Sequence, residues 1–93
     1  MIKSFKDSNT AKIWSRRYTK AHSKELQNAT LLKLLIIDSA TDLNDLRVPP
    51  ANRLEKLTGN RADYYSIRVN KQWRICFTWK NGDAYDVELI DYH

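Results

Sequence analysis

The sequence predicts an α+β domain in which N-terminal helices pack on one face of a small antiparallel sheet. Apolar residues have helical spacing before Pro49-Pro50 and alternate with polar ones after it. The last third of the chain is also rich in β-branched and aromatic residues, which favour strands. Helices followed by strands are typical of this class. We expect residues 1–93 to form a single domain, because a chain of 93 residues supports one modest core.

The N-terminal third is predicted to contain a short strand and then a weak basic helix. The strand covers residues 1–5, and the helix covers residues 10–20 with Ile13, Trp14 and Tyr18 as its apolar contacts. Its high charge density disfavours a stable isolated helix, so we expect this segment to be mobile in the free protein. The break before the helix offers three side chains as its N-terminal cap: Asp7, Ser8 and Asn9.

A longer helix is predicted over residues 24–40. Its second half, LLKLLII at residues 31–37, is apolar around too much of its circumference for an exposed helix, so we expect it to pack deeply. A short helix over residues 41–46 is expected next, with Thr41 as its cap. Pro49-Pro50 then predicts an extended loop, because proline disfavours helical backbone at the residue before it.

Three strands are predicted after the prolines, over residues 64–69, 73–79 and 84–90. The pair Asn81-Gly82 favours a type I′ hairpin turn between the last two strands, because both central residues of that turn need a positive φ. Asn70-Lys71-Gln72 is expected to form the turn between the first two. Short connections of this kind produce an antiparallel meander.

Strand alternation sorts the side chains of the first two strands into a core face and a polar face. The polar face carries Arg68 and Arg74, with Arg61 just upstream. Guanidinium groups converging there would bind a phosphate through their fixed forks of donors. The pattern also leaves open a structural role, as cross-strand ion pairs with Asp86, Glu88 or Asp91. The core face is predicted to carry Tyr65, Ile67, Val69, Trp73, Ile75, Phe77 and Trp79.

The formal charge of +5 is unevenly distributed along the chain. Residues 1–30 and residues 53–80 each carry seven Lys or Arg against two Asp or Glu, whereas residues 81–93 carry four acids and no Lys or Arg. Clustered basic charge is typical of proteins that bind polyanions. A solvated basic surface with no partner has the same composition, so charge alone leaves both interpretations open.

Composition excludes several classes of protein. Hydrophobic residues make up 42% of the chain, which predicts a folded core rather than disorder. Cys76 is the single cysteine, so an intramolecular disulfide and a thiolate metal cluster are excluded. The sequence has no metal-ligand spacing and no glycine-rich phosphate loop, so no metal or other cofactor is expected. It has no apolar run of about 20 residues and no secretory signal, which predicts a cytoplasmic protein without a membrane partner.

Several stretches of the chain match one known family in sequence and in relative position. They are MIKSF at residues 1–5, LNDLRVPPANRLEKLTGNR at 43–61, SIRVNKQWRICF at 66–77, NGDAY at 81–85 and DYH at 91–93. With these stretches the chain resembles the RelE-type toxins of bacterial toxin–antitoxin systems, and in particular the HigB branch, also called plasmid-maintenance killer proteins. The resemblance spans nearly the whole chain and is loose over residues 8–30.

The resemblance implies a ribosome-dependent mRNA endonuclease that inhibits translation and growth and needs no metal. It also implies a compact sheet with helices on one face, in agreement with the periodicity. The implied partners are the ribosome, mRNA and a small HigA-like antitoxin with a helix-turn-helix domain, and operator DNA is bound only through the toxin–antitoxin complex. Active-site residues of the family come from the concave sheet face and the C-terminal end, here Arg68, Arg74, Asp91, Tyr92 and His93.

Our hypothesis for the chemistry is attack of a ribose 2′-OH on the adjacent phosphorus, which leaves a 2′,3′-cyclic phosphate. The two strand arginines would stabilise the charge of the transition state. His93 is the candidate acid or base, because imidazole titrates near neutral pH. Asp91 would orient that imidazole or act as the base itself, and Tyr92 would stack on a nucleobase or support the proton transfer. The family has a histidine and a lysine where this chain has Glu55 and Thr58, so the resemblance does not assign the general base.

A second set of residues, mostly basic, is expected to bind RNA. Those expected to contact 16S ribosomal RNA are Arg16, Arg17, Lys20 and Lys24. Those expected nearer the message are Lys56, Arg61, Asn70 and Lys71. Two other functions compete with the endonuclease: a ParE-like inhibitor of DNA gyrase, which has a similar fold, and an RNA- or ribosome-binding module without catalysis.

Overall fold

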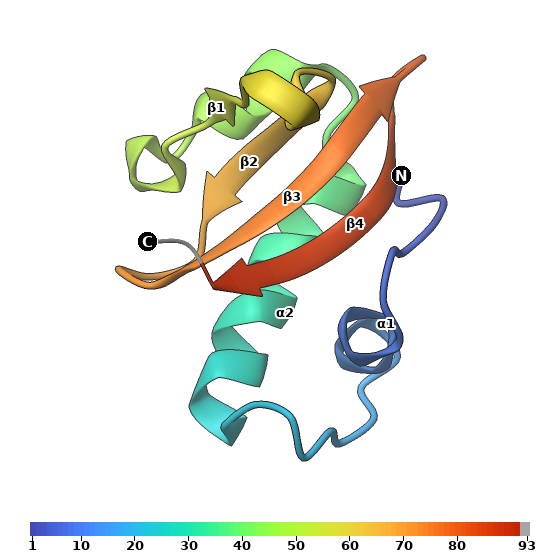
Figure 1. The fold of residues 1–93 in the computed structure, drawn as a ribbon, viewed down its shortest axis with the longest axis vertical. Helices are drawn as coiled ribbons and strands as arrows, with labels where there is room; N and C mark the ends of the chain where they lie inside the picture. The colour runs from blue at the N-terminus through green and yellow to red at the C-terminus, as the bar shows by residue number, and fades with distance from the viewer. Residues whose placement is uncertain (92–93) are drawn as a thin grey trace.

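The computed structural model describes residues 1–91 as two α-helices and a four-stranded sheet. Figure 1 shows the long helix α2 crossing behind the sheet and the short helix α1 beside it, near β4. The strands follow the order β1-β2-β3-β4, and every neighbouring pair is antiparallel. The predicted α+β class, with N-terminal helices on an antiparallel sheet, is confirmed.

Helix α1 (Ser8–Trp14) begins at Asp7, one of the three predicted caps, whose carboxylate accepts a hydrogen bond from the backbone N–H of Thr10 at 3.1 Å. The helix stops well before residue 20, so its predicted C-terminal half is wrong. The helix ends in a Schellman motif, in which Arg16 has a positive φ of 59°. Glycine usually occupies this position. The predicted packing of Tyr18 is also wrong, because that side chain lies beyond the helix and is 72% exposed.

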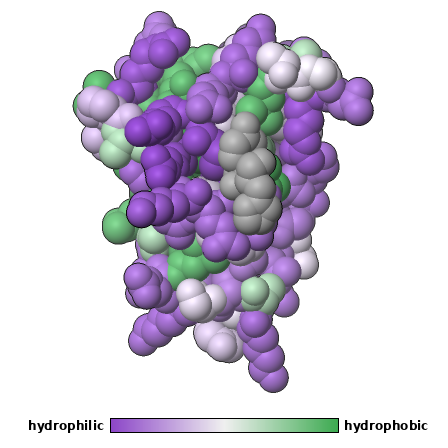
Figure 2. Space-filling model, turned by 60° about the vertical axis from the view of Figure 1, so that its left-hand side comes forward, coloured by the Kyte–Doolittle hydropathy of each residue, from purple (hydrophilic) through white to green (hydrophobic). Residues whose placement is uncertain are grey.

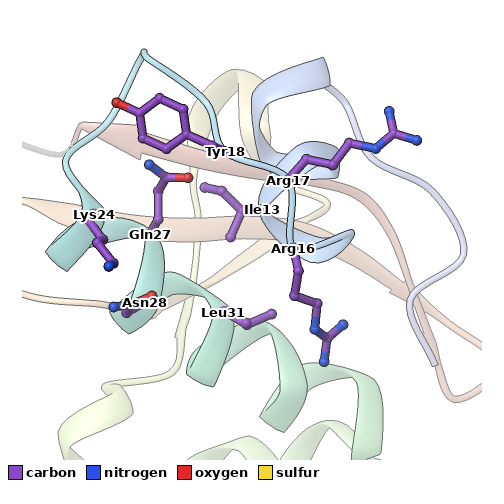
Figure 3. A pocket seen from close by; sticks show the side chains of 8 residues that line it. All are labelled: Ile13, Arg16, Arg17, Tyr18, Lys24, Gln27, Asn28 and Leu31. Atoms are coloured by element: carbon purple, nitrogen blue, oxygen red, sulfur yellow. The ribbon is translucent and has the colours of Figure 1, made fainter.

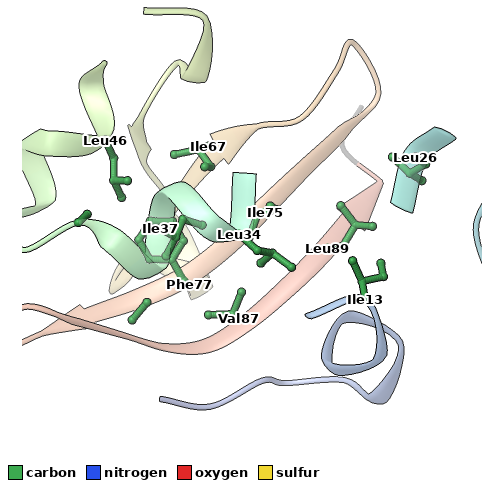
Figure 4. Packing of buried hydrophobic residues seen from close by; sticks show 12 residues of the cluster. Ile13, Leu26, Leu34, Ile37, Leu46, Ile67, Ile75, Phe77, Val87 and Leu89 are labelled. Carbon is green, nitrogen blue, oxygen red and sulfur yellow. The ribbon is translucent and has the colours of Figure 1, made fainter. Parts of the chain in front are cut away.

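Helix α2 (Lys24–Ser39) occupies the predicted segment. Its inner side is fully buried, and Figure 4 shows Leu34 and Ile37 among the hydrophobic side chains of the sheet. Its outer side is exposed, with Leu32 at 64% and Leu35 at 39%. The prediction that the whole LLKLLII run packs deeply is therefore wrong for these two leucines, because the sheet covers one side of the helix.

The predicted short helix is present as a 3-10 helix, η1 (Leu43–Arg47), but its cap is Asp42 rather than Thr41. The Asp42 carboxylate accepts from the N–H of Asn44 at 2.8 Å, and the Asp45 carboxylate accepts from the N–H of Asp42 at 3.1 Å. Two carboxylates thus form a reciprocal capping box, and charged acceptors make stronger hydrogen bonds than a threonine hydroxyl.

The backbone is extended at Val48 and Pro49, as predicted, but the extended stretch ends there because Pro50 begins a 3-10 helix, η2 (Pro50–Asn52). Proline is compatible with the first position of a helical turn, where its missing N–H has no partner to lose. A third short 3-10 helix, η3 (Gly59–Arg61), precedes the three main strands. It follows the two-residue strand β1 (Glu55–Lys56), which is too short to show a sequence period and was not predicted.

The three predicted strands are present with bounds within one residue of prediction: β2 (Tyr64–Arg68), β3 (Trp73–Lys80) and β4 (Asp83–Asp91). Asn81 and Gly82 have φ values of 54° and 82°, as the predicted hairpin turn requires. A side chain at Gly82 would also place its Cβ 3.2 Å from the carbonyl oxygen of Thr41, so the turn fits closely against the start of η1.

Strand β4 contains a bulge that changes which of its residues face the core. Asp86 has a φ of 52°, and the register with β3 shifts there. As a result Ala84, Val87 and Leu89 are all buried, although simple alternation would place Ala84 and Val87 on opposite faces.

The N-terminal segment lies along the outer edge of β4 and makes two parallel bridges, Ile2 to Ala84 and Phe5 to Val87. The backbone N–H of Asp86 donates to the Ser4 hydroxyl at 2.9 Å between them. The predicted strand over residues 1–5 is therefore not formed, because the bulge interrupts the ladder. The segment still covers an edge that would otherwise expose unpaired backbone groups.

The hydrophobic core lies between the helices and the sheet, as Figure 4 shows. Ile67, Ile75 and Phe77 are fully buried, and the other predicted core-face residues of β2 and β3 pack against them. The predicted assignment of faces in these two strands is confirmed. Within residues 1–91, no helix combines the length and the apolar character needed to cross a membrane.

A candidate active site on the polar face of the sheet

The polar face brings together the two arginines that the strand pattern selects. Arg68 on β2 and Arg74 on β3 are direct partners in the antiparallel register. Ser66 follows on the same face, and β1 adds Glu55 as the register partner of Ser66. Four polar side chains from three adjacent strands therefore lie on one side of the sheet.

Arg74 is buried, with 5% of its surface exposed, and its guanidinium is fixed by several hydrogen bonds. Its Nε donates to the Ser66 hydroxyl at 2.9 Å, and its Nη2 donates to the backbone carbonyls of Arg53 and Ser66 at 2.6 and 3.3 Å. A carboxylate oxygen of Glu55 lies 3.9 Å from the same Nη2. A buried cation needs such partners, because arginine stays charged and loses its hydration.

Glu88, one of the predicted cross-strand partners of the arginines, is paired with Arg61 at 3.5 Å. The guanidinium of Arg61 also lies 5.5 Å from the ring centre of Tyr64, and so reaches from η3 across the sheet. The carboxylate beside Arg74 comes instead from β1, which the sequence pattern does not reveal. The segment before β2 thus supplies two charged side chains to this face, Glu55 from β1 and Arg61 from η3.

Arg68 lies at the edge of this face and is half-buried. Its Nε donates to the backbone carbonyl of Asn70 at 2.9 Å. It lines a groove of about 390 Å³ together with Lys33, Arg53 and Lys71. The groove concentrates four cations at the end of β2, although the sequence predicts a functional role for only Arg68 and Lys71 among them.

Asn70 has a clear structural task in the turn between β2 and β3. Its side-chain oxygen accepts hydrogen bonds from the backbone N–H groups of Gln72 and Trp73, both at 2.8 Å. The predicted turn at residues 70–72 is therefore present and is held by an Asx motif. Lys71 at the tip of the turn is exposed.

Asp91 lies at the end of β4, opposite Trp73 in the register. Alternation therefore places it on the same side of the sheet as Trp73, and not on the side of Arg74. Its carboxylate accepts a hydrogen bond from the Gln72 amide at 3.0 Å. Tyr92 and His93, the other two predicted terminal groups, lie outside the described residues.

Cys76 is fully buried on β3 and is the register partner of Ser66. Burial raises the pKa of its thiol, and the Glu88 carboxylate acts in the same direction, while Arg61 and Arg74 oppose it. The thiol is therefore neutral at physiological pH, as expected for a small packing residue. Among residues 1–91, no cluster of three His, Cys, Asp or Glu side chains is arranged to hold a metal ion.

The N-terminal basic residues surround a separate cavity of about 320 Å³ between the α1–α2 loop and α2. Figure 3 shows Arg16, Arg17 and Lys24 at its margin, with the two guanidinium groups pointing in different directions. Arg16 donates to the carbonyl of Trp14 at 2.9 Å and lies 5.6 Å from the centre of its ring. Lys20, in the same loop, is exposed, as are Arg16, Arg17 and Lys24.

Gln27 ties this loop to α2. Its amide nitrogen donates to the carbonyls of Thr19 and His22 at 3.0 and 2.9 Å, and its oxygen accepts from the N–H of Thr19 at 3.3 Å.

Lys56, another predicted RNA-binding residue, lines a different hollow of about 720 Å³ together with Thr78 and Lys80. Figure 2 shows that hydrophilic side chains dominate the surface seen from the side on which β1 lies.

The groups that hold Arg74 are the part of the site that sequence reasoning missed. Alternation puts Ser66 on the correct face but assigns it no role, and Glu55 stands out only as a departure from the family. Arg53 contributes its backbone carbonyl, and Arg53 itself has a left-handed backbone with a φ of 46°. A side-chain pattern carries no signal for such a group. Glu55 could have been found, since it occupies the position of a family histidine.

Comparisons with solved structures agree with the fold. YafQ from E. coli strain BL21(DE3) superposes with a TM-score of 0.60 at 15% identity, covering 98% of this chain and 91% of that one. The YoeB–YefM complex from Staphylococcus aureus contains a chain that superposes with a TM-score of 0.60 at 20% identity, covering 100% of this chain and 98% of that one. At these identities the likeness concerns the fold alone.

Sequence comparisons are more specific. The chain is 36% identical to Endoribonuclease HigB of Proteus vulgaris over 93 residues, which is 100% of both chains. It is 48% identical to Toxin HigB-1 of Vibrio cholerae serotype O1 over 64 residues, which is 69% of this chain and 67% of that protein. The model of the family described as RelE-like toxin of type II toxin–antitoxin system HigB matches residues 3–93. The chain therefore belongs to the HigB family of RelE-like toxins of type II toxin–antitoxin systems.

Proposed function

We propose that this toxin is an endoribonuclease that cuts mRNA on the ribosome and is neutralised by an antitoxin. The observation that supports it best is the Arg74 guanidinium, fixed by Ser66 and Arg53 next to the Glu55 carboxylate on the polar face. A fixed cation beside a potential proton acceptor is what phosphodiester cleavage requires. The name of the Proteus vulgaris relative, Endoribonuclease HigB, supports the same chemistry.

The proposed reaction is a transesterification within the message. The ribose 2′ oxygen forms a bond to the adjacent phosphorus, and the bond from phosphorus to the 5′ oxygen breaks. The products are a 2′,3′-cyclic phosphate and a free 5′-OH. A base must take the 2′ proton, cations must stabilise the crowded phosphorane, and an acid must protonate the leaving oxygen. In the mechanism that we propose, side chains of the protein perform these three tasks without a metal ion.

Arg74 and Arg68 would stabilise the phosphorane. Arg74 is held in place before the substrate arrives, so its charge would need little reorganisation during the reaction. Arg68, nearer the edge, would contact a non-bridging oxygen or the next phosphate along the strand. The two are register partners on adjacent strands, a spacing that suits a single phosphodiester.

Glu55 would take the 2′ proton. It stands at the position of a family histidine, and it is exposed enough to meet a substrate while lying 3.9 Å from Arg74. His93 would protonate the leaving 5′ oxygen, because its imidazole titrates near neutral pH. Asp91 lies on the side of the sheet away from Arg74, because its register partner on β3 is Trp73. We therefore assign it to the positioning of His93 rather than to direct contact with the reacting phosphate. Tyr92 would stack on a nucleobase next to the cleaved bond.

A second set of residues would bind RNA and bring the toxin to the ribosome in the cytoplasm. We assign Arg16, Arg17, Lys20 and Lys24 to 16S ribosomal RNA, and Lys56, Arg61, Asn70 and Lys71 to the surroundings of the message. The antitoxin would be HigA-like, with a helix-turn-helix domain, and operator DNA would be bound only by the toxin–antitoxin complex. Family membership supports the antitoxin, and the chemistry of the basic surface supports the RNA.

The experiment that tests this function is primer extension on an mRNA in a purified translation system, with and without ribosomes. We expect wild type to cut only with ribosomes present, and Arg74→Ala to cut at background level. Cleavage that is independent of ribosomes would overturn the ribosome requirement. Absence of cleavage, combined with inhibition of DNA supercoiling in a parallel gyrase assay, would replace the endonuclease with gyrase inhibition.

A further inference from the structure

Helix α2 has two apolar sides, and the protein buries only one of them completely. Leu34 and Ile37 are buried against the sheet. The opposite side carries Ala29, Leu32, Ile36 and Ser39, which follow one another at alternating intervals of three and four residues. This is the spacing of a seam along which one helix packs against another. The LLKLLII run therefore satisfies the core and also leaves a second seam on the surface.

The outer seam borders a groove of about 580 Å³ that also includes Leu35 and Val69. Leu32 is almost two-thirds exposed, so residues 1–91 supply no element that covers it. From Ala29 to Ser39 the seam spans eleven residues of helix, or about 15 Å. That length matches about three turns of a partner helix. Contiguous exposed apolar surface of this kind commonly marks a binding site for another protein.

A basic row lies directly beside the apolar groove. The neighbouring groove of about 390 Å³ shares Lys33 and Val69 with it, and adds Arg53, Arg68 and Lys71. No acidic side chain lines either groove, and within the described part of the chain none of these four cations forms an ion pair. Lys33 does donate to the Asn52 amide oxygen at 2.6 Å, which holds its ammonium in place.

We infer that the outer face of α2 is the docking site for an amphipathic, acidic helix of the antitoxin. Apolar side chains of that helix fill the groove between Leu32 and Val69, and its carboxylates face the basic row. The mode is a helix in a groove, read by residues at intervals of three and four. The identification of the partner as the antitoxin rests on the proposed function, whereas the chemistry of the helix follows from the surface itself.

The charges of the surface favour this occupant over others. A second copy of the same chain would bring two sets of these cations together, and like charges at an interface oppose association. An RNA strand would be attracted by the basic row, but the groove is lined by aliphatic side chains and offers no aromatic ring for base stacking. An acidic amphipathic helix complements both surfaces, because its apolar side chains fit the groove and its carboxylates face the basic row.

Two synthetic helical peptides test the surface directly. Both carry leucines at the seam positions, and their flanking positions are glutamate in one peptide and lysine in the other. Calorimetry measures their binding to wild type, to Leu32→Glu and to the matched control Val48→Glu. Val48 is 70% exposed and lies outside both grooves, so it receives the same substitution without touching the site. Circular dichroism confirms that both variants are folded.

We expect the glutamate peptide to bind wild type and Val48→Glu equally, and Leu32→Glu at least about 30-fold more weakly, as for a residue at the centre of an interface. The lysine peptide should bind wild type more weakly than the glutamate peptide. Equal binding of the glutamate peptide to Leu32→Glu and wild type would overturn the inference. Equal binding of the two peptides to wild type would overturn the acidic character of the partner.

Co-expression separates this inference from the proposed function. The probe is the antitoxin that restores growth to cells making the wild-type toxin. We expect Leu32→Glu to arrest growth despite that antitoxin, and Val48→Glu to be neutralised normally, with mRNA cleavage intact in both variants. Full neutralisation of Leu32→Glu would overturn the docking site. A wild type that binds the glutamate peptide but cuts no mRNA would keep the surface and remove the endonuclease.

Discussion

Two basic segments of this toxin carry the same numbers of charged residues but have different structures. Residues 1–30 and residues 53–80 each carry seven cationic side chains against two acidic ones. In the first segment, Arg16 and Arg17 are exposed and their guanidinium groups point apart (Figure 3). In the second, Arg74 is 5% exposed and is held by Ser66 and Arg53. Equal charge in the sequence thus produces a diffuse field in one region and a fixed cation in the other.

This difference indicates which region can bind and which can catalyse. Exposed charges are screened by salt over about 8–10 Å and act additively, which suits long-range attraction of RNA. A buried charge acts through a lower effective dielectric and is stronger at short range. Because it is already oriented, it can stabilise a transition state without reorganising. Substitutions in the two segments should therefore differ in kind as well as in size.

The largest effect is expected for Arg74. Arg74→Ala should reduce mRNA cleavage by at least about 100-fold, since it removes a fixed charge from the reacting phosphate. It should also lower the free energy of unfolding by about 1–3 kcal/mol, because Ser66 and the Arg53 carbonyl lose their partner. Primer extension and thermal unfolding measure the two effects.

Arg74→Lys is the matched control for this substitution. Lysine keeps the charge but lacks the planar fork, so the variant should regain part of the stability and little of the cleavage rate. Full activity in Arg74→Lys would show that charge alone suffices and would weaken the distinction between the two basic segments.

A smaller but still large effect is expected for Glu55. Glu55→Gln keeps the size and the polar contact but cannot accept a proton, so cleavage should fall by about 100-fold while thermal stability changes little. Glu55→His restores the family residue and should recover part of the rate. Wild-type cleavage by Glu55→Gln would remove Glu55 from the mechanism and leave the base to the chain end.

The N-terminal segment should respond in a graded way. Reversing two charges, in Arg16→Glu combined with Arg17→Glu, should weaken ribosome binding by about tenfold or more and reduce its dependence on salt. Cleavage should recover at high ribosome concentration, because the reacting groups are untouched. Lys80→Glu, an exposed charge reversal in the second segment, is the control. Sedimentation with ribosomes at several salt concentrations gives the result, and an unchanged salt slope would exclude these arginines from the interface.

The smallest effect is expected for Asp45, an exposed carboxylate that is nevertheless fixed by hydrogen bonds. Hydrogen bonds from the backbone N–H groups of Thr41 and Asp42 hold its pKa below the usual value of 3.8. A depressed folded-state pKa stabilises the protein above the unfolded-state pKa, and this contribution disappears as the pH falls through the folded-state pKa. Asp45→Asn should thus lower the melting temperature slightly at neutral pH and not in strong acid. The same deficit at every pH would show that the lost stability is not electrostatic.

The sequence alone was sufficient for the main architecture and for the family. The position of α2, the three main strands and the Asn81-Gly82 turn followed from local periodicity and local turn chemistry, which neighbouring residues determine. The placement of Arg68 and Arg74 on one face of adjacent strands followed as well, because side chains alternate between the two faces of a sheet. Their direct pairing is a finding of the structure. The matched motifs by themselves point to the HigB branch, and the family comparison agrees.

Only the tertiary structure decided what surrounds these elements. The Arg53 carbonyl reaches Arg74 across 21 residues, and the β1 carboxylate approaches the same guanidinium from another part of the chain. Alternation predicts the face of a side chain but not its partner. In the same way, the composition of α2 did not reveal which of its leucines the sheet leaves exposed. Such contacts depend on how segments distant in sequence pack together, and a local pattern contains no record of that packing.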